Sequence, residues 1–164
     1  GKEIAKRAQA FGMKVIGYDV VKSEGLGIEY VEDIEKLISV ADIISLHVPV
    51  NPQTKGMFND KLFGLMKKGA ILINTSRAEV IDEDALIKAV KEKGVVAGVD
   101  VFKDEPEGKD GAVTSKLQNI DGIYVTHHIG ASTEQAQDAV AEETVKIIMD
   151  YKNSGKVLHC VNKK

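Results

Sequence analysis

Helical and strand patterns alternate along almost the whole chain, and this alternation most constrains its fold. Segments with apolar residues at helical spacing are separated by short apolar runs. We expect helices over residues 2–10, 33–39, 60–67, 83–93 and 132–152. We expect strands over residues 14–19, 43–47, 70–74, 95–100 and 123–126. Residues 102–119 are polar and irregular, which indicates a loop.

Local signals mark several helix ends. Asp82 precedes one expected helix as a cap and Gly94 follows it, as is typical of helix termini. Ser132 and Gln135 have the spacing of a capping box, so Ser132 is expected to open the last helix.

The expected strands are nearly continuous apolar runs, as in residues 43–46. Runs of this kind are typical of a sheet that is covered on both faces. Strands that alternate with helices over short links are joined by right-handed crossovers and lie parallel. The sequence therefore predicts an α/β fold with a doubly wound parallel sheet.

Composition excludes several classes of protein. The chain has 164 residues, the size of one ordinary domain, and its net charge of −3 lacks the basic surplus typical of nucleic-acid binding. No apolar run approaches the roughly 18 residues that cross a bilayer. We expect no signal peptide, and the single Cys160 is read as a small apolar residue in a reducing, cytoplasmic compartment.

Polar and ionisable residues follow the expected strands. They are Asp19, His47, Thr75, Ser76, Arg77, Asp100, His127 and His128. In open parallel sheets, ligands bind beyond the carboxyl ends of the strands. The pattern therefore predicts a ligand site at this edge of the sheet.

Each of these residues also has a plain structural interpretation. Asp19 lies about 20 residues after Gly1, the spacing of an acid that binds the adenosine ribose, but an Asp at a strand end is also a common turn residue. Arg77 can hold a carboxylate through two parallel hydrogen bonds or form a surface ion pair. His128 can act as an acid/base with Glu105 orienting its imidazole, or both can be ordinary loop residues.

Taken together, the segments resemble the NAD-dependent D-2-hydroxyacid dehydrogenase family. The resemblance rests on residues 1–5, 11–19, 46–49, 74–82, 100–106 and 127–133, in the family's order. Within the family, they look most like the D-3-phosphoglycerate dehydrogenase branch. This resemblance implies an NAD-binding Rossmann-type domain that acts on a small 2-hydroxy or 2-keto acid.

The resemblance also implies a role for each matching residue. Arg77 would bind the substrate carboxylate, His128 would be the acid/base, and Glu105 would orient His128. Cofactor-binding residues would be Gly1, Asp19, Val48, Pro49, Thr75, Ser76, Asp100, Gly130 and Ala131. His47 is read as structural or adenine-side. No metal is expected.

Two positions depart from the family pattern. His127 stands where relatives carry Pro, so the acid/base role goes to His128, which directly precedes Ile129 and Gly130. Ala78 and Glu79 replace two glycines, which indicates that this backbone needs no left-handed conformation.

The family's architecture implies that this chain is partial. Residues 1–152 match a dinucleotide-binding domain that lacks its first strand and the first glycines of its phosphate loop. Residues 153–164 would lead back towards an absent substrate domain. Loss of a central strand would leave its neighbours unpaired. A homodimer is expected from the family.

Three functional alternatives stay open at this point. One is another enzyme of the family, such as a hydroxypyruvate/glyoxylate reductase or a D-lactate dehydrogenase. Another is an NAD-sensing, corepressor-like binding protein. The last is an NAD-binding fragment without turnover.

Overall fold

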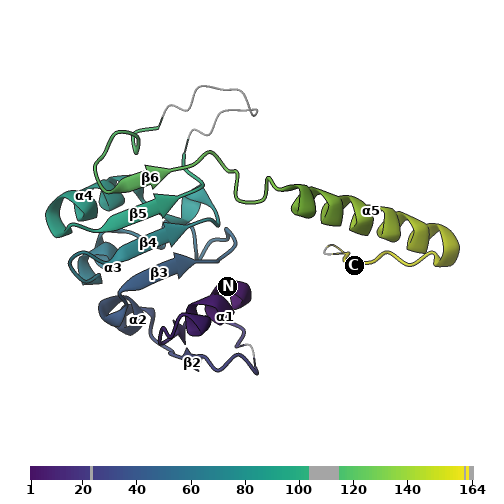
Figure 1. Cartoon of the computed structure of the whole chain (residues 1–164), viewed down its shortest axis with the longest axis horizontal. Coiled ribbons are helices and arrows are strands. Elements are labelled where there is room, and N and C mark those ends of the chain that lie inside the picture. Colours follow the sequence, from purple (N-terminus) through teal and green to yellow (C-terminus); the bar gives the residue numbers. More distant parts are fainter. Residues whose placement is uncertain (23, 104–114, 161, 163–164) are drawn as a thin grey trace. The chain divides into compact units, whose positions relative to one another are not determined.

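The computed structural model describes residues 1–22, 24–103, 115–160 and 162. These fall into two compact units, Gly1–His127 and His128–Lys164 (Figure 1).

A four-stranded parallel sheet forms the centre of the first unit. Its strands are β3 (Ile43–Leu46), β4 (Ile71–Asn74), β5 (Val96–Val99) and β6 (Ile123–Val125), in that order. Helix α2 (Ile34–Val40) precedes β3 in the sequence, α3 (Asp60–Leu65) lies between β3 and β4, and α4 (Glu83–Lys93) lies between β4 and β5. All neighbouring strands run parallel (Figure 1), which confirms the predicted parallel α/β fold.

A smaller parallel sheet follows the first helix. It consists of β1 (Ile16–Gly17) and β2 (Glu29–Tyr30), preceded by α1 (Lys2–Ala10). The predicted strand over residues 14–19 is therefore shorter than expected, and β2 was not predicted. Within the described residues, no ladder joins β1 to β3. Among the described residues, β3 is an edge strand of the four-stranded sheet, and its Ile43 is 48% exposed.

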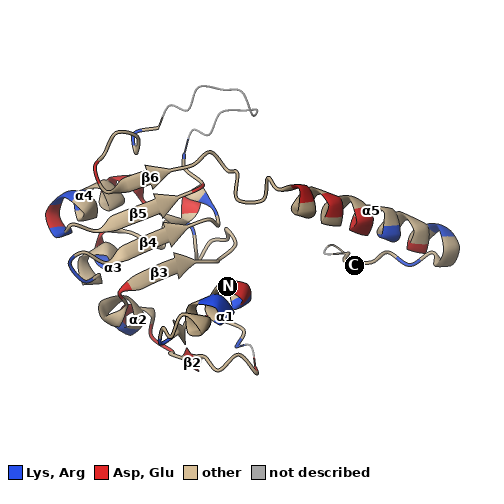
Figure 2. Cartoon of the chain, viewed as in Figure 1, with Lys and Arg blue, Asp and Glu red and all other residues tan. Residues whose placement is uncertain are grey.

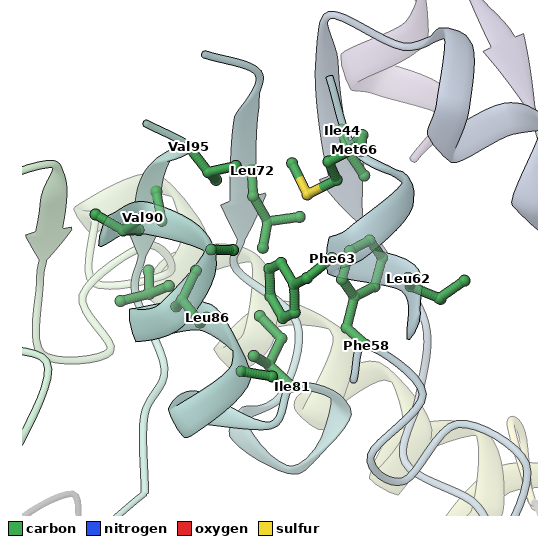
Figure 3. Close-up of a cluster of buried hydrophobic side chains, with 14 of the residues drawn as sticks. Ile44, Phe58, Leu62, Phe63, Met66, Leu72, Ile81, Leu86, Val90 and Val95 are labelled. Carbon is green, nitrogen blue, oxygen red and sulfur yellow. The ribbon is translucent and has the colours of Figure 1, made fainter. Parts of the chain in front are cut away.

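One face of the four-stranded sheet carries the core. Side chains of β3 and β4 alternate along each strand, so that Ile44 and Leu72 are buried while Ile43 and Ile71 are not. Figure 3 shows Leu72 of the sheet packed among Phe63 of α3 and Leu86 of α4. The ring of Phe63 meets that of Phe58 edge to face, with centroids 5.2 Å apart. Helices α3 and α4 are thus held to the sheet by apolar packing.

The ends of α4 follow the predicted signals. The Asp82 carboxylate accepts hydrogen bonds from the N–H groups of Asp84 and Ala85. Gly94 ends the helix at φ 65°, a left-handed conformation in which a side chain would be strained. Both expectations for this helix are confirmed.

The second unit contains the long helix α5 (Glu134–Ser154). Thr133 caps it by accepting a hydrogen bond from the Ala136 N–H, so the predicted cap at Ser132 is wrong by one residue. Ser132 instead donates its backbone N–H to the Ile129 carbonyl in the preceding turn. All residues of α5 are described and none is buried.

The predicted domain boundary at residues 152–153 falls near the end of α5. It remains a prediction about the domains of the native protein. Among the described residues, no helix combines the length and the apolar character needed to cross a bilayer.

Candidate cofactor and active site

The carboxyl edge of the four-stranded sheet brings polar residues together. The last paired residues of the strands are Leu46, Asn74, Val99 and Val125. The next residue along each strand therefore belongs to one further row, made of His47, Thr75, Asp100 and Thr126. We call this row the strand-end row. The strands themselves carry no Asp, Glu, Lys or Arg (Figure 2), so Asp100 is the first charge met along β5.

Asp100 is a buried carboxylate within the strand-end row. It is 7% exposed, and its Oδ1 accepts a hydrogen bond from the Thr126 hydroxyl at 2.5 Å. The backbone N–H of Asp100 donates to the Asn74 carbonyl at 2.9 Å. A buried carboxylate is stable when such donors offset its lost hydration. Asp100 can therefore serve as a fixed acceptor at the ligand-binding edge.

Asn74 organises the turn that carries Arg77. Its side chain is 1% exposed, and its Nδ2 donates to the Arg77 carbonyl at 3.0 Å. Its Oδ1 accepts from both the backbone N–H and the hydroxyl of Ser76, at 3.0 and 2.8 Å. A buried amide with these three bonds holds residues 74–77 in one conformation.

Arg77 itself is exposed at the start of the short 3-10 helix η1 (Ala78–Val80). Its Nη1 donates to the Ser76 carbonyl at 2.7 Å. A guanidinium has five N–H donors, so it retains the capacity to bind a carboxylate. Ala78 and Glu79 are absent from the described non-glycine residues with positive φ, as their replacement of glycine predicted.

His47 lies beside the start of α1. Its ring carbons are about 3.6 Å from where a Cβ on Gly1 would lie. Its Nε2 is 2.9 Å from the Ser45 hydroxyl. Burial lowers the pKa of His47. The imidazole is thereby biased towards its neutral form.

The remaining predicted cofactor residues of the first unit are close to strand ends. Asp19 is exposed after β1, and its Oδ1 accepts from the Val21 N–H at 3.0 Å, as in a turn. Val48 packs against the core, and the Pro49 carbonyl accepts from the Thr54 hydroxyl at 2.6 Å. Ser76 is half-buried and Thr75 is exposed.

The predicted catalytic residues are divided between the units. Arg77 belongs to the first unit, whereas His128 begins the second, together with Gly130 and Ala131. His128 has φ 54°, a conformation that costs energy for most side chains and is often found at functional sites. Glu105 lies outside the described residues.

The first unit has chemistry that suits a dinucleotide. Gly1 begins α1 with no side-chain cap hydrogen bond, and the N–H groups in the first turn of a helix can bind an anion. Asp19 offers an exposed carboxylate to ribose hydroxyls and would repel a 2′-phosphate. Asp100 supplies a buried acceptor for an amide or hydroxyl donor. These residues together fit NAD better than NADP.

Two residues with clear structural roles at this edge were missed as site residues. Asn74 lies within a matched motif, and its burial beside Arg77 became visible only in the fold. Thr126 was assigned to the end of a strand, and only the register of β6 against β5 brings it to Asp100. For both Asn74 and Thr126, the sequence offers one signal, a polar residue at the last position of an apolar run.

Comparison with known proteins identifies the family. The sequence model of "D-isomer specific 2-hydroxyacid dehydrogenase, NAD binding domain" matches residues 1–130. The chain is 44% identical over 154 residues to the chloroplastic D-3-phosphoglycerate dehydrogenase 2 of Arabidopsis thaliana, covering 90% of this chain and 24% of that protein. It is 45% identical over 150 residues to the hydroxypyruvate reductase of Thermotoga maritima, covering 90% of this chain and 48% of that protein.

A solved structure agrees with this assignment. The D-lactate dehydrogenase of Lactobacillus jensenii, solved with NAD⁺, superposes with a TM-score of 0.89 at 29% identity. The alignment covers 99% of this chain and 52% of that one. The chain spans about a quarter to a half of the length of the curated relatives that it matches. The chain thus belongs to the NAD-binding-domain family of D-isomer-specific 2-hydroxyacid dehydrogenases, whose cofactor is NAD.

Proposed function

We propose that the protein is an oxidoreductase that exchanges a hydride between NAD(H) and C2 of a small D-2-hydroxy acid. The family match over residues 1–130 carries this proposal. The strand-end row supports it, because polar groups collect where such a sheet binds its ligands.

The proposed substrate pair is D-3-phosphoglycerate and 3-phosphohydroxypyruvate, which would place the enzyme in serine biosynthesis. Its support is the resemblance to D-3-phosphoglycerate dehydrogenases from Arabidopsis thaliana and Escherichia coli. Reduction of hydroxypyruvate or glyoxylate is the second candidate. The comparable identity to the Thermotoga maritima hydroxypyruvate reductase favours it.

Three residues would act on the substrate. Arg77 would bind the carboxylate of the keto acid and polarise its keto oxygen, since a guanidinium can donate two parallel hydrogen bonds. His128 would give a proton to that oxygen during reduction and remove it during oxidation. Glu105 would hold His128 in the productive tautomer and stabilise its protonated form.

The remaining residues would hold the cofactor. NAD(H), when bound, supplies or accepts the hydride. Asp19 would accept hydrogen bonds from the adenosine ribose, and Asp100 would accept one from the nicotinamide amide. Val48, Pro49, Thr75 and Ser76 would line the cleft, and Gly130 and Ala131 would lie beside the nicotinamide. The protein would act as a cytoplasmic homodimer.

Steady-state assays of the native protein test the substrate. NADH oxidation is followed with 3-phosphohydroxypyruvate, hydroxypyruvate, glyoxylate, pyruvate and 2-oxoglutarate, and each kcat/KM is compared. The proposal expects the highest value with 3-phosphohydroxypyruvate. A higher value with hydroxypyruvate or glyoxylate would transfer the assignment to the second candidate.

Cofactor titration separates an enzyme from a binding protein. The chain has no Trp, so NADH emission can be followed without tryptophan background. NADH binding without turnover of any of these acids would support the non-catalytic alternative. Tighter binding of NADPH than of NADH would contradict the role of Asp19.

A further inference from the structure

The side chains of Thr126 and Asp100 are in contact at the carboxyl edge of the four-stranded sheet. The Thr126 hydroxyl lies 2.5 Å from Asp100 Oδ1. The two residues belong to neighbouring strand ends and are 26 positions apart in the sequence. Their contact is therefore a product of the tertiary fold.

The register of the sheet holds both residues in place. Val125 pairs with Val99, and the Thr126 N–H continues the ladder by donating to the Val99 carbonyl at 3.0 Å. On the other side, the Asp100 N–H donates to the Asn74 carbonyl at 2.9 Å. The backbones on both sides of the contact are thus fixed by ladder bonds.

The direction of the hydrogen bond follows from the chemistry of the two groups. The Thr126 hydroxyl donates to Asp100 Oδ1, so the carboxyl oxygen is the acceptor. The bond is partly buried, where a hydrogen bond is electrostatically stronger than in water. It restricts rotation of the carboxylate about its terminal torsion, which is otherwise broad.

We propose that Thr126 is a positioning residue for the cofactor. Its hydroxyl orients the Asp100 carboxylate so that this group accepts a hydrogen bond from the amide of the nicotinamide ring. This inference rests on the proposed role of Asp100. The inference adds one expectation about specificity. The Thr126–Asp100 pair favours a pyridine ring whose substituent carries an N–H donor over a ring whose substituent has none.

A purely structural role for Thr126 makes a different prediction. If the hydroxyl only attached β6 to β5, its loss would weaken the binding of every ligand in the cofactor cleft to the same extent. If it orients Asp100, its loss affects the nicotinamide half alone. The two roles are separated by ligands that share the adenosine diphosphate ribose but differ at the pyridine ring.

The test compares three ligands and three variants of the native protein. The ligands are NAD⁺, its 3-acetylpyridine analogue, whose acetyl group has no N–H, and ADP-ribose, which has no pyridine ring. Thr126→Val removes the hydroxyl at nearly constant shape, and Thr126→Ser retains it. Thr144→Val is the matched control, because the Thr144 hydroxyl donates to the Val140 carbonyl on the exposed surface of α5. Calorimetry gives each Kd.

The wild type is expected to bind NAD⁺ more tightly than the acetyl analogue. Thr126→Val is expected to weaken NAD⁺ binding by roughly tenfold and to remove this preference, with ADP-ribose affinity unchanged within about twofold. Thr126→Ser is expected to restore the preference. Thr144→Val is expected to behave as wild type for all three ligands.

Other outcomes would overturn the proposal. If Thr126→Val weakened the binding of NAD⁺ and of ADP-ribose equally, the role of Thr126 would be structural only. Unchanged NAD⁺ affinity would show that the hydroxyl is not needed. A wild type that binds ADP-ribose but does not distinguish NAD⁺ from the analogue would remove the role of Asp100, and the proposal with it. A wild type that binds none of the ligands would overturn the cofactor assignment as well. If Thr126→Val does not fold, two measurements still test the proposal. They are the affinities of Thr126→Ser for the three ligands and the preference of the wild type for NAD⁺ over the acetyl analogue.

Discussion

Helices α4 and α5 are delimited by the same local signals and differ completely in burial. A side chain caps each helix at its start, Asp82 in α4 and Thr133 in α5, and each ends at a left-handed glycine. Yet α4 buries Leu86, Ala89 and other residues against the sheet, whereas α5 buries none of its described residues. Local signals therefore determine where a helix begins and ends, and they do not determine whether it buries an apolar face within its own unit.

The residues of the proposed site are also divided between the two units. The first unit contains Asp100 and the other strand-end residues, which have a surrounding hydrogen-bond network. The second unit begins with His128, in a left-handed conformation. We therefore expect cofactor binding and proton transfer to respond to mutation separately, and stability to depend mainly on the first unit.

The largest effect is expected at His128. His128→Gln should lower kcat of the native enzyme by roughly 10²–10⁴-fold, because it removes the proton donor of the reduction. The Kd for NADH should change by less than about threefold, because the cofactor contacts of the first unit remain. Stopped-flow turnover and NADH fluorescence measure the two quantities. His127→Gln is the matched control, and turnover of His128→Gln within twofold of wild type would transfer the role to His127.

Truncation of one apolar side chain in each helix should give the second-largest effect, a different loss of stability for α4 and for α5. Leu86→Ala in α4 should lower the free energy of unfolding by about 2–5 kcal/mol, because Leu86 is fully buried and leaves a cavity. Ile148→Ala in α5 should lower it by about 0.5 kcal/mol or less, because Ile148 is 59% exposed. Urea denaturation measures both values. Equal losses would show that the apolar side of α5 is packed in solution.

Removing the N-cap side chains of α4 and α5 should also affect stability differently, with smaller effects than core truncation. Asp82→Ala should cost about 1 kcal/mol of global stability, because α4 unfolds together with the core. Thr133→Ala should reduce the helical circular dichroism of α5 with little change in the urea midpoint of the first unit. Asp82→Asn retains the acceptor and should behave close to wild type. A matching loss of global stability in Thr133→Ala would mean that the units unfold together.

The smallest effect concerns pH. Burial lowers the pKa of His47 below its ordinary value of 6.5 in the folded state, so the unfolded state takes up a proton first as the pH falls. Stability should therefore decrease between about pH 7.5 and about pH 5.5, and His47→Gln should lose less over the same range. Thermal unfolding at the two pH values measures the difference. An equal decrease in both proteins would contradict the assignment to His47.

Much of the fold could be predicted because its signals are local or repetitive. The alternation of helices with apolar strands predicted a parallel α/β fold, and the motifs around Asn74 and His128 identified the family and NAD. The Ser132 cap was wrong because adjacent Ser and Thr offer the same hydroxyl, and only the backbone decides which one caps α5. Strand β2 was missed because two paired residues leave no periodic pattern.

The candidate site was less predictable than the fold. Residue types and motif spacing predicted Asp19, Arg77 and Asp100, and the structure places them at or near strand ends. The supporting contacts of Asn74 and Thr126 could not be predicted, because a buried amide or a strand-end hydroxyl has no meaning until its neighbours are known.

The sequence by itself determined the parallel α/β class, the family and the order of the polar residues along the chain, because helix caps, glycines and apolar runs act over a few residues. Tertiary structure alone decided which side chains of α4 are buried in the core of the first unit. It also decided that Thr126 meets Asp100, since strand register, which is a pairing between distant segments, selects which side chains share a row.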